Sequence, residues 1–414
     1  MPQRHVPTSH RLADVRYEIR GELARRAREL EAQGRRLIKL NIGNPGAFGF
    51  RAPPHLQAAI AGHLGDSDPY CHQQGLEVAR EAVAALHRGR GALQVDATRV
   101  FIGNGVSELI DLALRALLNP GDEVLLPSPD YPLWSAATIL NGGTPVYYDC
   151  LPDNGFLPDP AQVAAQITPH TRALVLINPN NPSGASYPRE LLQALVDLAG
   201  RHRLLLLADE IYDGILYDDA RFEPLAPLAG ELPCLSFGGL SKVHRACGYR
   251  VGWVALSGEP SRAAEYTHAL DLLGELRLCA NVPGQWAVPA ALEGDATIDA
   301  LTAPGGRLHE SRRAVIEACA RSEFLRVVAP AAALYAFPGV DPLLLPDFDD
   351  HRFALALLDE EDVLVVPGSS FNVRYRNHFR VTLLPEADQV REVFVRIERL
   401  LARLALARRD RHVA

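Results

Sequence analysis

Lysine is rare in this chain of 414 residues, and the place of one lysine suggests amine chemistry. Of the 42 basic residues, two are lysines, Lys39 and Lys242, which leaves 40 arginines. Lys242 lies in GGLSKVHRACGYR, after a short apolar run and ahead of Arg250. A primary amine can lose its proton and attack a carbonyl, whereas a guanidinium stays charged. Lys242 is therefore a candidate for a Schiff base and Arg250 for a bidentate phosphate contact. Both could also be solvated loop residues. For Lys39 we favour the interpretation that it is a surface charge retained by chance.

An acidic residue ends the most apolar predicted strand. Asp209 follows LLLLA, and a buried carboxylate is costly unless it meets a cation or a strong donor. A protonated pyridine nitrogen is such a partner, and Tyr212 can offer a phenol to the same ligand. Asp209 could instead cap the following helix.

Two more loops carry polar residues directly after apolar strands. Gly105, Val106 and Ser107 lie where RVFIGN turns into a helix, so their N–H groups could bind a phosphate. Glu108 stands where a dinucleotide-binding series would place its third glycine, which weakens a nicotinamide interpretation. In NPNNPSG, Asn181 could contact a ligand oxygen. Taken alone, the first loop is also a good helix start and the second is ordinary turn chemistry.

The elements that must position these residues alternate between strand and helix. From about residue 99, apolar runs such as ALVLIN and VGWVAL alternate with amphipathic helices such as SELIDLALRALL, which predicts an α/β fold with a mostly parallel central sheet. Ligands of such sheets bind at the loops beyond the carboxyl ends of the strands. All four candidate loops occupy that position.

The two ends of the chain do not show this regular alternation of strands and helices. A helix is predicted over 11–33, followed by the loop LNIGNPGAFGF, and an amphipathic helix is predicted over 386–408. We expect an N-terminal segment over 1–50 that packs with a small domain, a large cofactor-binding domain over 51–300, and a small α+β domain over 301–414.

Charge and cysteine content exclude several classes of protein. The net charge of −8 argues against a nucleic-acid or anionic-membrane partner. No apolar run approaches the length of a membrane span, and the start of the chain lacks the apolar core of a secretory signal, so we expect a cytoplasmic protein. The six cysteines form no CxxC pair and no zinc pattern, so we expect reduced thiols and no metal.

Taken together, the motifs resemble those of the class I/II aminotransferases, which are pyridoxal-phosphate enzymes of fold type I. The resemblance covers nearly the whole chain, and bacterial alanine (glutamate–pyruvate) aminotransferases are the most similar subfamily. The matching stretches are KLNIGNPGAFGF, FIGNGVSELI, PSPDYPLW, INPNNPSG, ADEIYDGILYDD, GGLSKVHRACGYRVGW, LCANVP, ALYAFP and HFRVTLLP. NPNNPSG, DEIY and SK…GYR in this order are a very specific signature.

The resemblance implies that several residues bind the cofactor pyridoxal 5'-phosphate. Lys242 would hold the cofactor covalently and move the substrate proton, and Asp209 would pair with the pyridine nitrogen. The other cofactor contacts that it implies are Tyr212 and Asn181 at the phenolic oxygen, Tyr131 stacked on the ring, and Arg250, Gly105, Val106 and Ser107 at the phosphate.

The resemblance also implies substrate contacts and a partner subunit. Arg380 would bind the substrate α-carboxylate, assisted by the backbone of Gly43 and by Asn181. Tyr70 would reach the phosphate of a second subunit, which implies a homodimer. Arg20, with Tyr17 nearby, is a candidate for the second carboxylate of 2-oxoglutarate, although Arg20 could equally be a solvated helix arginine.

Two positions depart from the pattern of the family. Gly239 replaces a hydroxyl residue three positions before the lysine, so Ser241 would take over a phosphate contact or that contact would be absent. Ser183 replaces the more usual threonine, which we expect to be a mild change.

These features predict an aminotransferase that exchanges the amino group of L-alanine with 2-oxoglutarate by ping-pong kinetics. The alternatives are an aminotransferase for branched or aromatic amino acids, a pyridoxal-phosphate β-lyase, and a non-catalytic sensor of the same fold.

Overall fold

A seven-stranded, mostly parallel sheet forms the centre of the computed structural model, which describes residues 6–15 and 21–413. Its strand order is β2-β8-β7-β6-β5-β3-β4, and β8 alone runs antiparallel to its neighbours. The expected α/β fold with a mostly parallel sheet is confirmed. The strands are β2 (Val100–Gly103), β3 (Glu123–Ser128), β4 (Thr144–Asp149), β5 (Thr171–Ile177), β6 (Leu205–Asp209), β7 (Cys234–Gly239) and β8 (Gly252–Ser257).

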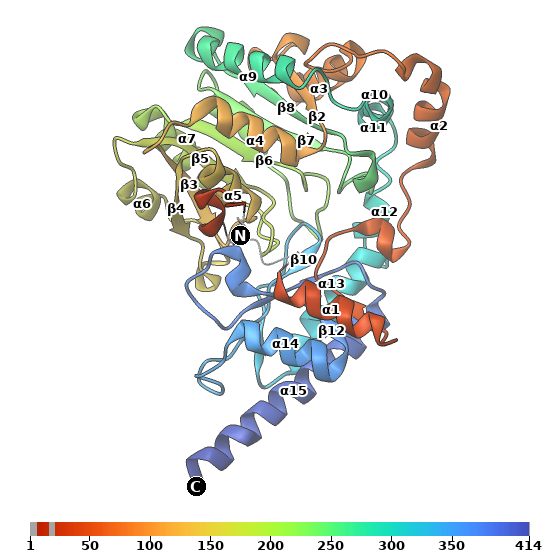
Figure 1. Cartoon of the computed structure of the whole chain (residues 1–414), viewed down its shortest axis with the longest axis vertical. Coiled ribbons are helices and arrows are strands. Elements are labelled where there is room, and N and C mark those ends of the chain that lie inside the picture. Colours follow the sequence, from red (N-terminus) through yellow and green to blue (C-terminus); the bar gives the residue numbers. More distant parts are fainter. Residues whose placement is uncertain (1–5, 16–20, 414) are drawn as a thin grey trace, which may run out of the picture.

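Helices cover both faces of this sheet (Figure 1). Successive strand residues point to opposite faces, so Leu207 belongs to one buried cluster and Leu206 to the other. Both faces need apolar side chains, which explains why these strands read as continuous apolar runs. One face is covered by α4 (Val106–Leu117), α5 (Leu133–Leu140) and α9 (Ala264–Leu276); the other by α3 (Glu77–Gly89), α6 (Pro160–Ala165), α7 (Arg189–His202) and α8 (Leu225–Ala229).

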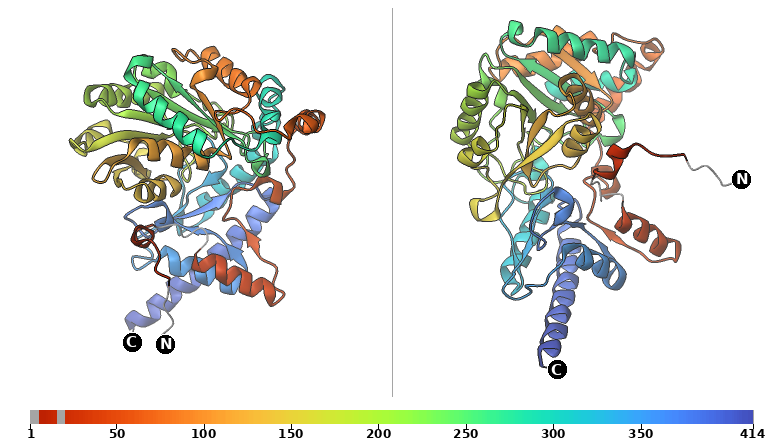
Figure 2. Two further views of the ribbon diagram at one scale, coloured as in Figure 1. Left: turned by 45° about the horizontal axis from the view of Figure 1, so that its top comes forward. Right: turned by 60° about the vertical axis from the view of Figure 1, so that its left-hand side comes forward.

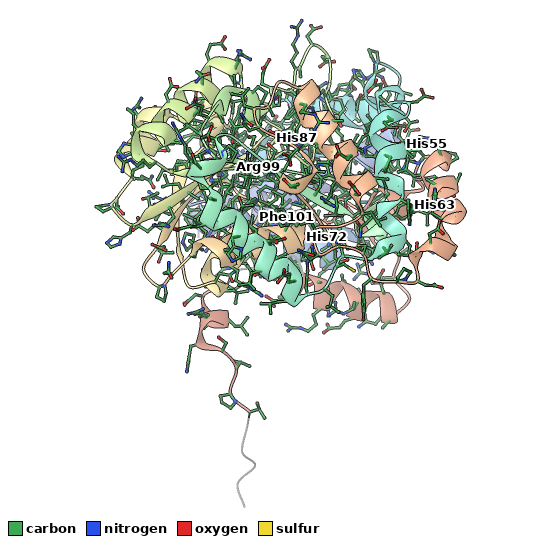
Figure 3. All side chains as sticks on the ribbon, turned by 90° about the horizontal axis from the view of Figure 1, so that it is seen from above. His55, His63, His72, His87, Arg99 and Phe101 are labelled. Carbon is green, nitrogen blue, oxygen red and sulfur yellow. The ribbon has the colours of Figure 1, made fainter. Side chains whose placement is uncertain are left out.

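Short helices fill the end of the sheet next to β2. In the view from above, His63 lies at the edge of the molecule, and His87 and Arg99 lie nearer its centre (Figure 3). These helices are α2 (Pro54–Gly62), α10 (Val282–Gln285) and α11 (Ala287–Glu293), whereas α12 (Asp299–Thr302) packs on α13 (Arg307–Arg321) of the C-terminal part.

The C-terminal part forms a second core of small sheets and helices. The last helix, α15 (Ala387–Val413), packs on α13 and then extends away from the body (Figures 1 and 2). The sheets are β10-β14-β13, β11-β9 and β1-β12, built from β1 (Ile38–Lys39), β9 (Leu325–Arg326), β10 (Tyr335–Ala336), β11 (Gly339–Val340), β12 (Val363–Leu364), β13 (Val366–Pro367) and β14 (Phe379–Thr382); the other helices are α13 (Arg307–Arg321) and α14 (Asp350–Glu361).

The N-terminal segment joins this second core. β1 pairs with β12 in parallel, and α1 (Glu22–Ala32) packs on α14. The single helix predicted over 11–33 is wrong, because a 3-10 turn over His10–Ala13 ends at Asp14 and α1 begins only after Gly21. Gly21 has a non-helical backbone (φ −78°, ψ −137°) that a continuous helix does not allow. The proposed domain boundaries at residues 50 and 300 stay predictions.

Within the described residues, no helix is long and apolar enough to cross a membrane. The same part of the chain contains no group of three or more His, Cys, Asp or Glu residues arranged to hold a metal ion. All six cysteines are free thiols.

Candidate active site

A cavity of about 600 Å³ opens at the carboxyl ends of the central strands, between the sheet and the C-terminal core. The ends of β5 and β6 contribute Ile177 and Asp209, and the loop after β7 contributes Lys242. The lining residues are Asn41, Ile42, Gly43, Asn44, Val106, Ser107, Ile110, Tyr131, Ile177, Asn181, Asp209, Ile211, Tyr212, Ser241, Lys242, Cys247, Gly248, Arg250, Tyr335 and Arg380.

The amine of Lys242 lies inside this cavity. Its Nζ donates a hydrogen bond to the carbonyl of Gly43 at 2.8 Å, across 199 residues of sequence. Lys39, in contrast, forms a surface ion pair with Glu31 at 2.7 Å, with about half of its side chain exposed. The geometry therefore separates the two lysines into one at the cavity and one on the surface.

Asp209 is a buried carboxylate at the cavity wall. Its side chain accepts hydrogen bonds from the indole N–H of Trp134 at 3.0 Å and from the backbone N–H of Ile211 at 3.4 Å. Burial raises the pKa of Asp209, and the Trp134 bond, the Ile211 N–H and the charge of Lys242 partly offset that rise. A cationic N–H donor in the cavity would stabilise the ionised carboxylate further, which is the role that a protonated pyridine nitrogen would fill.

The start of α4 and Arg250 form a cradle of N–H donors. Gly105, at φ 86°, precedes the helix and leaves its N-terminus without a side-chain cap. The Arg250 guanidinium donates to the Asn104 carbonyl at 3.1 Å and the Cys247 carbonyl at 3.0 Å. A Cβ on Gly105 would lie 2.4 Å from Arg250 Nη2, so a larger residue would be strained at this φ and would displace the guanidinium. Helix N-termini and arginine both favour phosphate.

The strand next to these N–H donors also approaches them closely. A Cβ on Gly252 would lie 2.4 Å from the Val106 nitrogen. Glu108, which interrupts the glycine series, accepts a hydrogen bond from the Asn104 backbone N–H at 2.7 Å and pairs with Arg277 at 2.9 Å. Glu108 therefore holds the loop in shape rather than facing the cavity.

Arg380 reaches the cavity from β14. It is 2% exposed, and its Nη1 donates to Asn181 Oδ1 at 2.9 Å while its Nη2 donates to the Asn41 carbonyl. The guanidinium carbon lies 4.3 Å from the ring centre of Tyr335 and 4.8 Å from that of Phe371. A guanidinium fixed between two rings is well oriented to bind a carboxylate with two hydrogen bonds.

Tyr212 and Tyr335 form a phenol pair beside Arg380. The Tyr212 hydroxyl donates to the Tyr335 hydroxyl at 3.1 Å. Burial and the neighbouring Tyr335 raise the pKa of Tyr212 well above its usual value, so this phenol stays protonated. A Cβ on Gly43 would lie 2.0 Å from the Tyr335 hydroxyl, so the chain can approach this closely only with glycine.

Most of the residues singled out in the sequence meet in this one cavity. Gly105 lies at its edge beside Arg250, while Tyr70 is 77% exposed and is not among the lining residues. Arg20 and Tyr17 lie outside the described residues. The cavity lining brings together Gly43, Val106, Ser107, Tyr131, Asn181, Asp209, Tyr212, Ser241, Lys242, Arg250 and Arg380. Their individual roles stay predictions.

Sequence reasoning missed three residues that the structure brings to the site. Tyr335, Trp134 and the carbonyl of Asn41 contact Tyr212, Asp209 and Arg380 respectively. The motifs ALYAFP and PSPDYPLW contain the two aromatic residues, but no local pattern indicates what they contact.

The backbone around Gly239, which departs from the family pattern, leaves little room for a side chain. A Cβ at this position would lie 2.8 Å from the Val251 carbonyl oxygen and 3.0 Å from the Gly252 Cα. A hydroxyl side chain does not fit this backbone without a shift. Ser241 lines the cavity and is available for a phosphate contact.

Comparisons with known proteins agree with this geometry. A family model described as aminotransferase class I and II matches residues 35–397. The chain is 47% identical to an alanine aminotransferase of Mycobacterium tuberculosis over 96% of the chain and 92% of that protein. It is 43% identical to the glutamate–pyruvate aminotransferase AlaA of Escherichia coli over 96% of the chain and 98% of that protein. A crystal structure of an aminotransferase from Escherichia coli superposes with a TM-score of 0.95 at 43% identity, covering 96% of the chain and 99% of that structure.

Proposed function

Because this chain belongs to the class I and II aminotransferases, we propose that it transfers an amino group between L-alanine and 2-oxoglutarate, giving pyruvate and glutamate. Enzymes of this family depend on pyridoxal 5'-phosphate. The observation that carries the proposal is the meeting of Lys242, Asp209 and Arg380 in one cavity. The names of the two curated relatives support alanine as the amino donor.

The residues present fit the cofactor. Lys242 would hold its aldehyde carbon, Asp209 its pyridine nitrogen, and the α4 N-terminus with Arg250 its phosphate. Cofactor binding would give both groups a favourable charge: the buried Asp209 carboxylate gains a cationic partner, and the helix start without a side-chain cap gains an anion. When bound, the cofactor supplies an electron sink for the carbanion left when the substrate Cα proton leaves.

Residues of the chain would supply proton transfer and substrate binding. With the cofactor bound, Asp209 would be ionised and would hold the proton of the pyridine nitrogen, while the Nζ of Lys242 would move the proton from the substrate Cα. Arg380 binds the α-carboxylate and thereby orients the Cα–H bond toward that amine. Tyr131 would stack on the cofactor ring, and Asn181 and Tyr212 would contact its phenolic oxygen.

The second carboxylate of 2-oxoglutarate needs its own donor. Among the described residues, the cations that line the cavity are Lys242, Arg250 and Arg380, and each has a role already. We therefore propose Arg20, with Tyr17, for this contact. Arg20→Ala should raise the KM for glutamate and 2-oxoglutarate and leave that for alanine unchanged. An unchanged preference between glutamate and alanine would remove Arg20 from the site.

We also propose that the enzyme is a homodimer in which Tyr70 contacts the cofactor phosphate of the partner subunit. Tyr70, Leu276 and Leu278 are large apolar residues that are 77%, 75% and 54% exposed, which supports a covered surface in the assembly. The test mixes inactive Tyr70→Ala subunits with inactive Lys242→Ala subunits. If Tyr70 acts across the interface, the mixed dimers contain one intact site and regain activity. A mixture that dimerises and stays inactive would place Tyr70 in its own subunit's site, and a Tyr70→Ala protein that is fully active by itself would remove Tyr70 from the site.

A screen of amino donors and acceptors tests the substrate assignment. Purified protein with added cofactor should form glutamate from alanine and 2-oxoglutarate faster than from branched or aromatic amino acids. Pyruvate and ammonia released without any added 2-oxo acid would instead support a β-lyase. No turnover with any pair would support the non-catalytic alternative. The cytoplasmic location stays a prediction from the sequence.

A further inference from the structure

Two segments far apart in the sequence meet beside the active site through four hydrogen bonds. The side-chain amide of Asn372 donates to Asp130 Oδ1 at 2.9 Å and to Ser135 Oγ at 3.0 Å. The Ser128 hydroxyl donates to the Asn372 carbonyl at 2.9 Å, and the Asp130 backbone N–H donates to the Phe371 carbonyl at 3.1 Å. We call these four bonds the Asp130–Asn372 latch. It joins the chain after β3 to the turn after β13.

Each side of the latch carries residues of the site. Tyr131, which lines the cavity, follows Asp130 directly, and Trp134 on the same segment donates to Asp209. On the other side, Phe371 precedes Asn372, and its ring centre lies 4.8 Å from the guanidinium carbon of Arg380. One segment therefore faces the cofactor ring and the other supports the carboxylate-binding arginine.

We propose that Asp130 and Asn372 are positioning residues of the transamination reaction, because their latch fixes the distance between Tyr131 and Arg380. The inference rests on the proposed function, since it takes Tyr131 as the residue stacked on the cofactor ring and Arg380 as the residue that binds the substrate carboxylate. An error of about 1 Å in the placement of a substrate can lower the rate by roughly a hundredfold. A rigid link between the two binding groups is therefore valuable to the reaction.

The latch is costly as a purely structural contact. Asp130 is fully buried, and within the described part of the chain its Oδ2 has no hydrogen-bond partner. Burial raises the pKa of this carboxyl to about 7, so an apolar side chain would be cheaper to bury here. Asn372 adopts φ 57°, a left-handed conformation that asparagine tolerates better than most residues. Costs of this kind are typical of residues that serve a site.

A reciprocal exchange tests the latch. Asn372→Asp places two carboxyl groups at a contact of 2.9 Å, where they repel each other when both are ionised. The double variant Asp130→Asn with Asn372→Asp restores one amide and one carboxylate at the same place. Asp362→Asn is the matched control, because Asp362 also has a left-handed backbone (φ 59°) and a side-chain bond, to Arg35, that lies outside the cavity lining.

The measurements are kcat and KM for alanine, the absorption spectrum of the bound cofactor, and the thermal midpoint. We expect Asn372→Asp to lower kcat/KM roughly ten- to a hundredfold and to shift the cofactor absorption band. The double variant should recover most of both. Asp362→Asn should lower only the thermal midpoint.

Several outcomes would overturn the inference. Asn372→Asp with wild-type kcat/KM and spectrum would show that the latch does not position the site, and so would a folded double variant that stays as impaired as the single one. If Asn372→Asp does not fold, Asn372→Gly removes the same amide at a backbone that glycine accepts. If the wild-type protein binds the cofactor and transaminates nothing, the proposed function fails, whereas the spectrum still tests the latch.

Discussion

Replacing Arg380 with lysine tests how the substrate carboxylate is bound. The guanidinium is 2% exposed, and two of its nitrogens donate to Asn181 and Asn41. Its remaining N–H groups can bind both oxygens of a carboxylate, whereas the compact ammonium of lysine cannot reproduce that fork. Arg380→Lys should therefore lose one charge-assisted hydrogen bond to the substrate.

The size of the effect follows from that one bond. A hydrogen bond to a charged group contributes about 1.5–3 kcal/mol, and each 1.4 kcal/mol corresponds to about a tenfold change in rate. We expect kcat/KM for L-alanine to fall roughly ten- to 150-fold. The assay is the rate of the first half-reaction, followed by cofactor absorption, with L-alanine and with ethylamine, which is alanine without its carboxylate.

Comparing alanine with ethylamine distinguishes a loss of carboxylate binding from a general loss of activity. Arg380→Lys should leave the slow reaction of ethylamine unchanged, since this amine has no group for Arg380 to bind. Arg80→Lys is the matched control, because Arg80 is similarly buried and donates to the carbonyls of Gly75 and Ala97. It should lower stability without changing the preference for alanine. An equal loss for alanine and ethylamine in Arg380→Lys would refute the assignment.

Three further substitutions test packing and titration. Gly239→Ala should lower the free energy of unfolding by about 1–3 kcal/mol in urea titrations, because its Cβ would lie 2.8 Å from the Val251 carbonyl; an unchanged midpoint would contradict this. Gly43→Ala should displace Tyr335 and lower kcat/KM for alanine at least tenfold, and wild-type kinetics would show that this contact does not matter. Burial lowers the pKa of His87 to about 3, so the unfolded chain takes up a proton before the folded protein does as the pH falls below 6.5, and the folded protein loses stability there. From pH 7 to 5, the free energy of unfolding of His87→Leu should therefore fall by about 2 kcal/mol less than that of the wild type. An equal fall in both proteins would refute the pKa shift.

The central sheet and much of the site could be predicted because both have local signals. Strands buried on both faces read as apolar runs, and Asp209 stands out because it ends such a run. Lys242 stands out because lysine is otherwise almost absent. Both follow parallel strands, whose carboxyl ends must meet at one edge of the sheet.

The rest depends on contacts that leave no local pattern. Trp134 and Asp209 are 75 residues apart, and Asp130 and Asn372 are 242 apart, so their pairing is set only by the folded chain. The helix predicted over 11–33 failed for a different reason. Its apolar spacing continues past Gly21, and the non-helical backbone of that glycine interrupts the helix in spite of the spacing.

The most direct test of the account is to locate the cofactor on the chain. Borohydride reduction of the protein loaded with pyridoxal 5'-phosphate, followed by peptide mapping, should find the reduced cofactor on Lys242. The chain offers a built-in control, since Lys39 is its only other lysine and pairs with Glu31 on the surface. Label on Lys39, or on neither lysine, would contradict the account.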